Sequence, residues 1–162
     1  MATQENSNNQ VVPIPPAGNS RFGIVVAEWN TKVTEALFDG AKVALLDHGA
    51  SEENIIKHYV PGSFELPLGA QFMAHSKKVD AVICLGCIVQ GETRHFEFIA
   101  SSVADGVTQV GLKYDMPVIF GVLTPDNEQQ ALDRAGGKYG NKGEEAAIAA
   151  LKMLAMKKGL NG

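Results

Sequence analysis

The amino-acid sequence predicts an α/β fold, a single-domain three-layer α/β/α sandwich built around a four-stranded parallel sheet. Short apolar runs alternate with longer segments whose apolar residues recur at helical spacing, and this alternation is typical of such folds. The clearest case is 81–98, where a buried strand, a glycine-containing polar loop and a helix start follow one another. The length of 162 residues suffices for one domain with a sizeable core.

The composition is that of an ordinary globular protein, with 45% hydrophobic and 20% charged residues. A formal net charge of −4 argues against broad nonspecific binding to nucleic acid or to an anionic membrane. No apolar run approaches the roughly 18 residues of a membrane span, and we find no secretory signal. We therefore expect a cytoplasmic protein with neither a membrane nor a nucleic-acid partner.

The two cysteines, Cys84 and Cys87, form a C-x-x-C pair. This spacing is compatible with redox chemistry or with half of a zinc site. However, a second cysteine pair is missing, and Cys84 lies inside an apolar run rather than at a helix start. We favour the interpretation that both are small core residues, whose free thiols suit a reducing cytoplasm.

The N-terminal stretch 1–20 is rich in Asn, Gln, Ser and Pro and shows no apolar period. We expect a flexible arm there, followed by one domain over 21–162. As an alternative, the segment 11–14 (Val-Val-Pro-Ile) could add to the edge of a neighbouring sheet, where proline is tolerated. Both interpretations stay open on sequence alone.

The first two strands of the domain are predicted over 21–27 and 54–60, because both runs are short and largely apolar. The helix between them is expected to be capped by Asn30 or Thr31 and to be stopped by Gly49. A strand followed by a helix and a second strand is the basic unit of a parallel sheet.

The next elements follow the same order. A polar loop at 61–65 leads into a helix that we expect to run to about His75. The third strand is predicted over 81–85, and its helix begins at about His95, where the apolar spacing changes to that of a helix.

The fourth strand is predicted over 117–121. Thr124 then resembles a helix N-cap, with Pro125 at the first helical position, and this helix is expected to run to about Ala135. Glycines at 136–140 interrupt the chain before the last helix.

The last helix has a clear start signal, because Asn141 and Glu144 have the spacing of a capping box. Its buried face is expected to be formed by small and aliphatic residues. These are Ala147, Ala150, Leu151 and Leu154.

Polar candidate residues follow each of the four predicted strands. Because the carboxyl ends of parallel strands meet at one edge of the sheet, we expect one ligand site along that edge. The candidates are Trp29 and Asn30, Ser63 and Glu65, the residues from Gln90 to His95, and those from Thr124 onward.

Trp29 and Glu65 each allow two interpretations. Trp29, the only tryptophan, follows a strand directly and could stack on a flat ring, or it could be an ordinary rim aromatic. Glu65 could accept hydrogen bonds from hydroxyls or amines of a ligand, or it could simply complement the start of its own helix.

The loop at 90–95 carries the strongest chemical signal. Thr93, together with the main-chain amides around Gly91 and Glu92, can hold a phosphate, because a helix start favours anions. His95 stands at the same point, and histidine as a residue type titrates near neutrality. Anion binding combined with proton transfer is the hypothesis that this loop supports.

Other catalytic patterns find little support. Gly137-Lys138 is followed by Tyr139, so the sequence has no Walker motif, and it has no G-x-S-x-G elbow. His48, His58 and His75 are expected to have surface or structural roles. Because no group of His, Asp and Glu has ligand spacing, we expect no metal site.

Five blocks of residues, spread in order over nearly everything after Arg21, match one family. The blocks are 25–30, 60–67, 85–96, 117–124 and 134–143. As an ordered set they resemble the 6,7-dimethyl-8-ribityllumazine synthases of riboflavin biosynthesis. The resemblance implies a flavodoxin-like fold and a transferase. It implies condensation of 5-amino-6-(D-ribitylamino)uracil with 3,4-dihydroxy-2-butanone 4-phosphate to 6,7-dimethyl-8-ribityllumazine, phosphate and water, with no metal or organic cofactor.

The same resemblance implies roles for individual residues. His95 matches the proton-transfer residue and is the expected catalytic group. Expected substrate-binding residues are Trp29, Asn30, Ser63, Phe64, Glu65, Cys87, Ile88, Val89, Phe120 and Lys142. Expected phosphate-binding residues are Gly91, Glu92 (through its main chain), Thr93 and Arg134. Glu145 matches a carboxylate that is often found near the histidine.

The resemblance also implies an assembly. The family forms homo-oligomeric pentamers with active sites at subunit interfaces, to which Phe120, Arg134 and Lys142 would be contributed by the adjacent subunit. The short link 136–143 is similar to that of members that build icosahedral 60-mer cages, so we expect a cage. Riboflavin synthase is a candidate partner.

Two other functions compete with this one. A flavodoxin-like electron-transfer module would need a retained flavin. A non-catalytic binding protein or inert cage of the flavin pathway would bind a lumazine without making one.

Overall fold

The computed structural model describes residues 12–162 and contains one four-stranded parallel sheet in the order β2-β1-β3-β4. The strands are β1 (Phe22–Ala27), β2 (Ile55–Val60), β3 (Ala81–Cys87) and β4 (Val118–Leu123). The helices are α1 (Thr31–Asp47), α2 (Leu66–His75), α3 (His95–Tyr114), α4 (Glu128–Asp133) and α5 (Lys142–Asn161). The predicted α/β sandwich with a four-stranded parallel sheet is confirmed.

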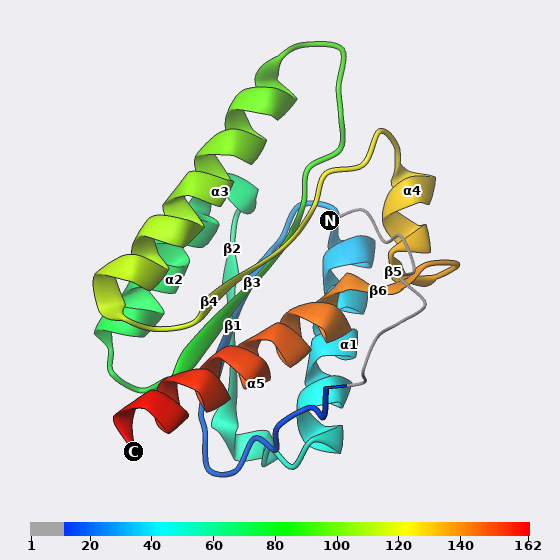
Figure 1. The fold of residues 1–162 in the computed structure, drawn as a ribbon. Helices are drawn as coiled ribbons and strands as arrows, with labels where there is room; N and C mark the ends of the chain where they lie inside the picture. Colours follow the sequence, from blue (N-terminus) through cyan, green and yellow to red (C-terminus); the bar gives the residue numbers. More distant parts are fainter. Residues whose placement is uncertain (1–11) are drawn as a thin grey trace.

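Helices cover both faces of the sheet. Figure 1 shows α2 and α3 on one face and α1 and α5 on the other, with α4 beside the start of α1. This arrangement gives the three layers that the alternation of strands and helices predicts. None of the helices in residues 12–162 combines the length and the apolarity that a bilayer crossing requires.

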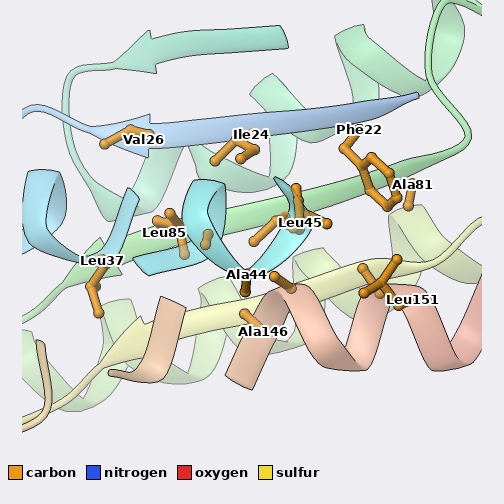
Figure 2. Close-up of a cluster of buried hydrophobic side chains, with 14 of the residues drawn as sticks. Phe22, Ile24, Val26, Leu37, Ala44, Leu45, Ala81, Leu85, Ala146 and Leu151 are labelled. Carbon is orange, nitrogen blue, oxygen red and sulfur yellow. The ribbon is translucent and has the colours of Figure 1, made fainter. Parts of the chain in front are cut away.

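The two inner strands, β1 and β3, are continuous apolar runs because their side chains are buried on both faces of the sheet. In Figure 2, Phe22, Ile24 and Val26 of β1 lie in one cluster with Leu45 of α1 and Leu151 of α5. The intervening residues of β1 pack on the opposite face, against α2 and α3. Both faces of the sheet are therefore used for the core, and the polar chemistry is confined to the strand ends.

Both cysteines are free and buried, as predicted for core residues. Cys84 faces the α2 and α3 layer, whereas Cys87 faces the α1 and α5 layer. Burial raises the pKa of the Cys84 thiol to about 12 and the pKa of the Cys87 thiol to about 11. Because a protonated thiol is a poor nucleophile, these groups serve packing rather than redox chemistry.

The segment before β1 packs onto the domain earlier than predicted. Of the arm expected over 1–20, residues 1–11 lie outside the described part of the chain, and this includes Val11 of the candidate edge segment. Ala17 is fully buried and donates its N–H to the carbonyl of His48 at 2.8 Å. Lys158 at the other end of the chain donates to the Ser20 hydroxyl at 2.6 Å. The burial of Ala17 and the hydrogen bond to the Ser20 hydroxyl thus hold residues 17–20 against the domain.

The predicted end of the fourth strand and the predicted cap of α4 are wrong. The strand expected over 117–121 continues to Leu123, which pairs with Cys87 of β3. The N-cap of α4 is Asn127, whose side chain accepts the Gln130 N–H at 3.0 Å, and not Thr124. The Pro125 carbonyl instead accepts the Gln90 N–H at 2.9 Å, so the segment after β4 stays tied to the loop after β3 and the helix starts later.

The glycine segment after α4 is a hairpin rather than a simple break. The helix ends at Asp133 instead of near Ala135, because β5 (Ala135–Gly137) pairs antiparallel with β6 (Gly140–Asn141). Asn141 then caps α5, as predicted, by accepting the Gly143 N–H at 2.8 Å.

Candidate active site

The turn between β1 and α1 is tied to the end of β2 by its backbone. The N–H of Glu28 donates to the Val60 carbonyl at 2.8 Å, and the N–H of Trp29 donates to the Pro61 carbonyl at 3.2 Å. The two strand-end loops therefore lie side by side at the carboxyl edge of the sheet, as parallel pairing requires.

Asn30 was one of the two residues expected to cap α1, and its side chain behaves differently from that expectation. It occupies the N-cap position of α1, but its side chain makes no capping hydrogen bond. Its backbone is left-handed, with φ of 61° and ψ of 45°, a conformation that asparagine tolerates better than most residues. The side-chain amide Nδ2 donates instead to the carbonyl of Cys87 at 2.8 Å.

Trp29 projects from the turn, with 71% of its surface exposed. Its indole lies over the backbone of the β2 to α2 loop, since a Cβ placed on Gly62 would be 3.4 Å from the indole carbon Cε3. The same Cβ would be 3.3 Å from the Glu65 carboxylate oxygen Oε2. Trp29, Gly62 and Glu65 thus form one wall at the sheet edge.

The loop after β2 is a single turn of 3-10 helix over Ser63–Glu65. Glu65 accepts the N–H of Gly62 at 3.0 Å, so its carboxylate complements the start of its own turn, one of the two interpretations of this residue. Phe64 is exposed and available to a ligand or a partner. Ser63 is buried, and its hydroxyl has no hydrogen-bond partner among the described residues.

Gly86 allows this turn to dock on β3. A Cβ on Gly86 would lie 2.5 Å from the Ser63 hydroxyl and 2.9 Å from Cδ1 of Leu66. The space beside Gly86 is therefore filled by the neighbouring loop. Around Gly91, by contrast, nothing lies within 4 Å of where a Cβ would be, so this glycine faces open space.

The loop between β3 and α3 is anchored at its base and exposed at its tip. Ile88 donates to the Leu123 carbonyl at 2.8 Å, and Gln90 donates to the Pro125 carbonyl at 2.9 Å. From 91 to 95 every residue is exposed. His95 begins the 20-residue helix α3, and its N–H lies 3.4 Å from the Thr93 hydroxyl. The helix start expected to hold an anion therefore stands open.

Three of the expected site residues lie away from this group. Phe120 is on the edge strand β4 and is 39% exposed. Arg134 follows α4 and stacks on Tyr139, with the guanidinium carbon 5.1 Å from the ring centre. Lys142 begins α5 and pairs with Glu145 at 2.5 Å.

The hairpin that carries Arg134 lies against α1, whereas His95 begins α3 on the opposite face of the sheet (Figure 1). Within residues 12–162, no hydrogen bond or ion pair joins Arg134 or Lys142 to Trp29 or His95. One chain therefore presents two separate halves of the expected site.

Two hydrogen bonds of the Asn141 side chain hold the hairpin in place, and only one of them could be predicted from the sequence. Asn141 donates its Nδ2 to the carbonyl of Ala36 in α1 at 2.9 Å. Gly40 leaves room for this contact, since a Cβ there would lie 2.3 Å from the Asn141 side chain. The capping signal identified Asn141, but nothing in the sequence points to its second bond, which spans more than 100 positions.

In the part of the chain that the structure describes, no cluster of three or more His, Cys, Asp or Glu side chains is placed to share a metal ion. The polar groups of the candidate site are amides, hydroxyls, the Glu65 carboxylate, one imidazole and the cations of Arg134 and Lys142, which flank the hairpin.

The comparisons with known proteins agree on one family. A family model described as 6,7-dimethyl-8-ribityllumazine synthase matches residues 19–158. A protein of that name from Cytophaga hutchinsonii is 60% identical over 154 residues, covering 95% of this chain and 97% of the relative. Proteins of the same name from Parabacteroides distasonis and Christiangramia forsetii are 52% and 48% identical, covering 94% and 98% of this chain and 96% of each relative.

Proposed function

Since this chain belongs to the 6,7-dimethyl-8-ribityllumazine synthase family, enzymes of riboflavin biosynthesis, we propose the full reaction that it catalyses. It condenses 5-amino-6-(D-ribitylamino)uracil with 3,4-dihydroxy-2-butanone 4-phosphate. The products are 6,7-dimethyl-8-ribityllumazine, inorganic phosphate and water. The observation that carries the proposal is that the family's sequence blocks coincide with three strand-end loops joined by direct hydrogen bonds.

The pyrimidine substrate is assigned to the wall formed at the ends of β1 and β2. Trp29 stacks on the flat ring, which its exposed position beside Gly62 supports. Phe64 and the main chain of 87–89 complete the pocket wall. Asn30, Glu65 and the main chain of Ser63 face the ribityl chain, since the Ser63 hydroxyl itself is buried.

The phosphate-bearing substrate is assigned to the open start of α3. Gly91 and Glu92 offer main-chain amides, Thr93 offers a hydroxyl, and the helix dipole favours the negative charge. Arg134 supplies the cation that this chain does not place there, and it comes from a second copy. Arginine suits this role because its planar fork matches phosphate oxygens.

His95 is assigned the proton transfers. The 5-amino group forms an imine with the substrate carbonyl and releases water. Phosphate then leaves by elimination, and the ribitylamino nitrogen closes the ring on the second carbonyl with loss of another water. Each step adds or removes a proton, and a histidine can do both near neutral pH. A placed acid or base typically contributes ~10²–10⁴-fold, and alignment of two substrates up to ~7–11 kcal/mol.

The site is completed in a homo-oligomer, a pentamer with an icosahedral 60-mer cage as its larger form. Large apolar side chains on the outer faces of α2 and α3 support burial against a second copy, among them Phe72, Phe98 and Leu112, which is 76% exposed. Phe120, Arg134 and Lys142 then come from the adjacent subunit. We assign the enzyme to the cytoplasm, with riboflavin synthase as a partner.

The direct test is to incubate the full-length protein with both substrates and to follow lumazine fluorescence and phosphate release. Stoichiometric formation of both products is the expected result. Binding of a lumazine without its formation would instead identify a binding protein. Tight retention of flavin mononucleotide without condensation would identify an electron-transfer module.

A further inference from the structure

The carbonyl of Cys87 at the end of β3 has no strand partner on its β1 side. Ile88 directs its N–H toward β4, where it meets the Leu123 carbonyl. Because successive residues of a strand direct their polar groups to opposite neighbours, the Cys87 carbonyl faces β1. The last register pair between these strands is Val26 with Leu85, so β1 has ended before it reaches this carbonyl.

Asn30 supplies the missing donor. Its Nδ2 lies 2.8 Å from the Cys87 carbonyl oxygen, across a sequence separation of 57 residues. A half-buried carbonyl without a donor is unfavourable, because it loses its bonds to water and gains none in return. The side chain therefore continues the hydrogen-bond ladder between β1 and β3 beyond the last strand residue.

Few residue types can do this at position 30. The left-handed backbone, with φ of 61°, favours glycine, asparagine or aspartate. Glycine has no side-chain donor, and an ionised aspartate can only accept hydrogen bonds. Asparagine alone among the three combines the backbone conformation with a donor.

The hydrogen bond between Asn30 and Cys87 also affects the position of Trp29, the preceding residue. The indole is 71% exposed, so core packing does not fix it, and its orientation depends on the turn that carries it and on its contact with Gly62. That turn is tied to β2 through the Trp29 N–H and to β3 through the Asn30 amide. Loss of the second bond leaves the turn held from one side only.

We infer that Asn30 is a positioning residue that sets the orientation of Trp29 through its bond to Cys87. One N–H of Nδ2 is committed to the carbonyl, so Asn30 offers a ligand the acceptor Oδ1 and the second N–H of Nδ2. A hydroxyl of the ligand can donate to the first or accept from the second. The ligand-facing part of this inference rests on the proposed function, whereas the orientation of Trp29 does not.

The test compares Asn30→Gly and Asn30→Asp with the unmodified full-length protein. Both variants accept the left-handed backbone, and both lack the donor. Since Trp29 is the only tryptophan, its emission maximum and its acrylamide quenching report on the turn in the free protein. We expect both signals to change in both variants. Asn127→Ala, which removes the cap of α4, is the control that lowers stability without changing them.

Steady-state kinetics form the second arm. We expect kcat/KM for the pyrimidine substrate to fall about five- to tenfold, the scale of one lost hydrogen bond, mainly through KM. Unchanged Trp29 emission and quenching in both Asn30 variants would overturn the positioning role. Changed emission with unchanged kinetics would keep that role and would instead refute the proposed stacking of Trp29 on the substrate.

Discussion

The hydroxyl of Ser63 occupies the space that a side chain on Gly86 would need, because a Cβ on Gly86 would lie 2.5 Å from it. The contact joins the end of β3 to the turn that carries Phe64 and Glu65. A glycine in an otherwise buried apolar strand thus decides how closely two loops of the candidate site approach each other.

Replacement of Gly86 with alanine is expected to push the Ser63–Glu65 turn away from β3. We expect the free energy of unfolding to fall by about 1–3 kcal/mol, as for overpacked cores, together with a loss of lumazine formation. Urea unfolding monitored by circular dichroism measures the first effect. Gly91→Ala is the matched control for stability, since a Cβ there meets nothing within 4 Å. Equal stability of the two variants would contradict the packing argument.

Ser63→Ala is expected to have the opposite effect. The hydroxyl is buried and has no partner among the described residues, so it retains a desolvation cost without a hydrogen bond. Its removal is expected to raise the free energy of unfolding by about 1 kcal/mol. A clear loss of stability in urea unfolding would show that the hydroxyl has a partner after all.

The Asn141 side chain makes two different hydrogen bonds, and two substitutions can distinguish their effects. Asn141→Asp keeps the acceptor that caps α5 but loses the donor to the Ala36 carbonyl, whereas Asn141→Ala loses both. We expect the aspartate variant to unfold close to the unmodified protein. Its KM for the phosphate-bearing substrate is expected to rise several-fold, because the hairpin carries Arg134 and Lys142. The alanine variant is expected to lose about 1 kcal/mol of stability as well. Unchanged kinetics in both variants would exclude a role in placing these cations.

Because both thiols are buried, we expect the protein to become less stable in alkaline solution. Burial raises the pKa of Cys84 to about 12 and of Cys87 to about 11, from a reference value of 9.0. Between these values the unfolded chain loses thiol protons that the folded chain retains, so the free energy of unfolding falls as pH rises above 9. Neither thiol is expected to react with a chromogenic disulfide at pH 8 until denaturant is added. Rapid reaction of the native protein would contradict their burial.

The order of strands and helices could be predicted because apolar periodicity reports burial, and burial on both faces defines the strands of a parallel sheet. The start of α4 could not. Thr124 and Pro125 form a good local start signal, but the Pro125 carbonyl accepts the Gln90 N–H from the loop after β3. Local signals fail where a contact distant in sequence competes with them.

The candidate site was likewise only partly predictable from the sequence. That Trp29, Glu65 and His95 follow strands was visible in the sequence, and strand ends meet at one edge by topology. The Asn30 bond to Cys87 and the Asn141 bond to Ala36 were not, since each joins residues that only the folded chain brings together. Asn30 or Thr31 was expected to cap α1, and Asn30 does occupy the N-cap position, but its side chain makes no capping hydrogen bond.

We propose that two copies of the chain complete each active site. His95→Ala and Arg134→Ala are each expected to lower lumazine formation by about 10²-fold or more. Co-expression of the two variants creates interfaces at which one copy supplies His95 and its neighbour supplies Arg134. For a head-to-tail ring with random mixing, about a quarter of the sites would be intact.

Turnover of such co-assembled variants is the most direct measurement. We expect activity to recover to about a quarter of that of the unmodified enzyme, in proportion to the share of intact interfaces. Separately purified variants, mixed without exchange of subunits, are the control and are expected to stay inactive. Co-assembled oligomers that contain both variants and yet show no more activity than the sum of the two alone would contradict the claim.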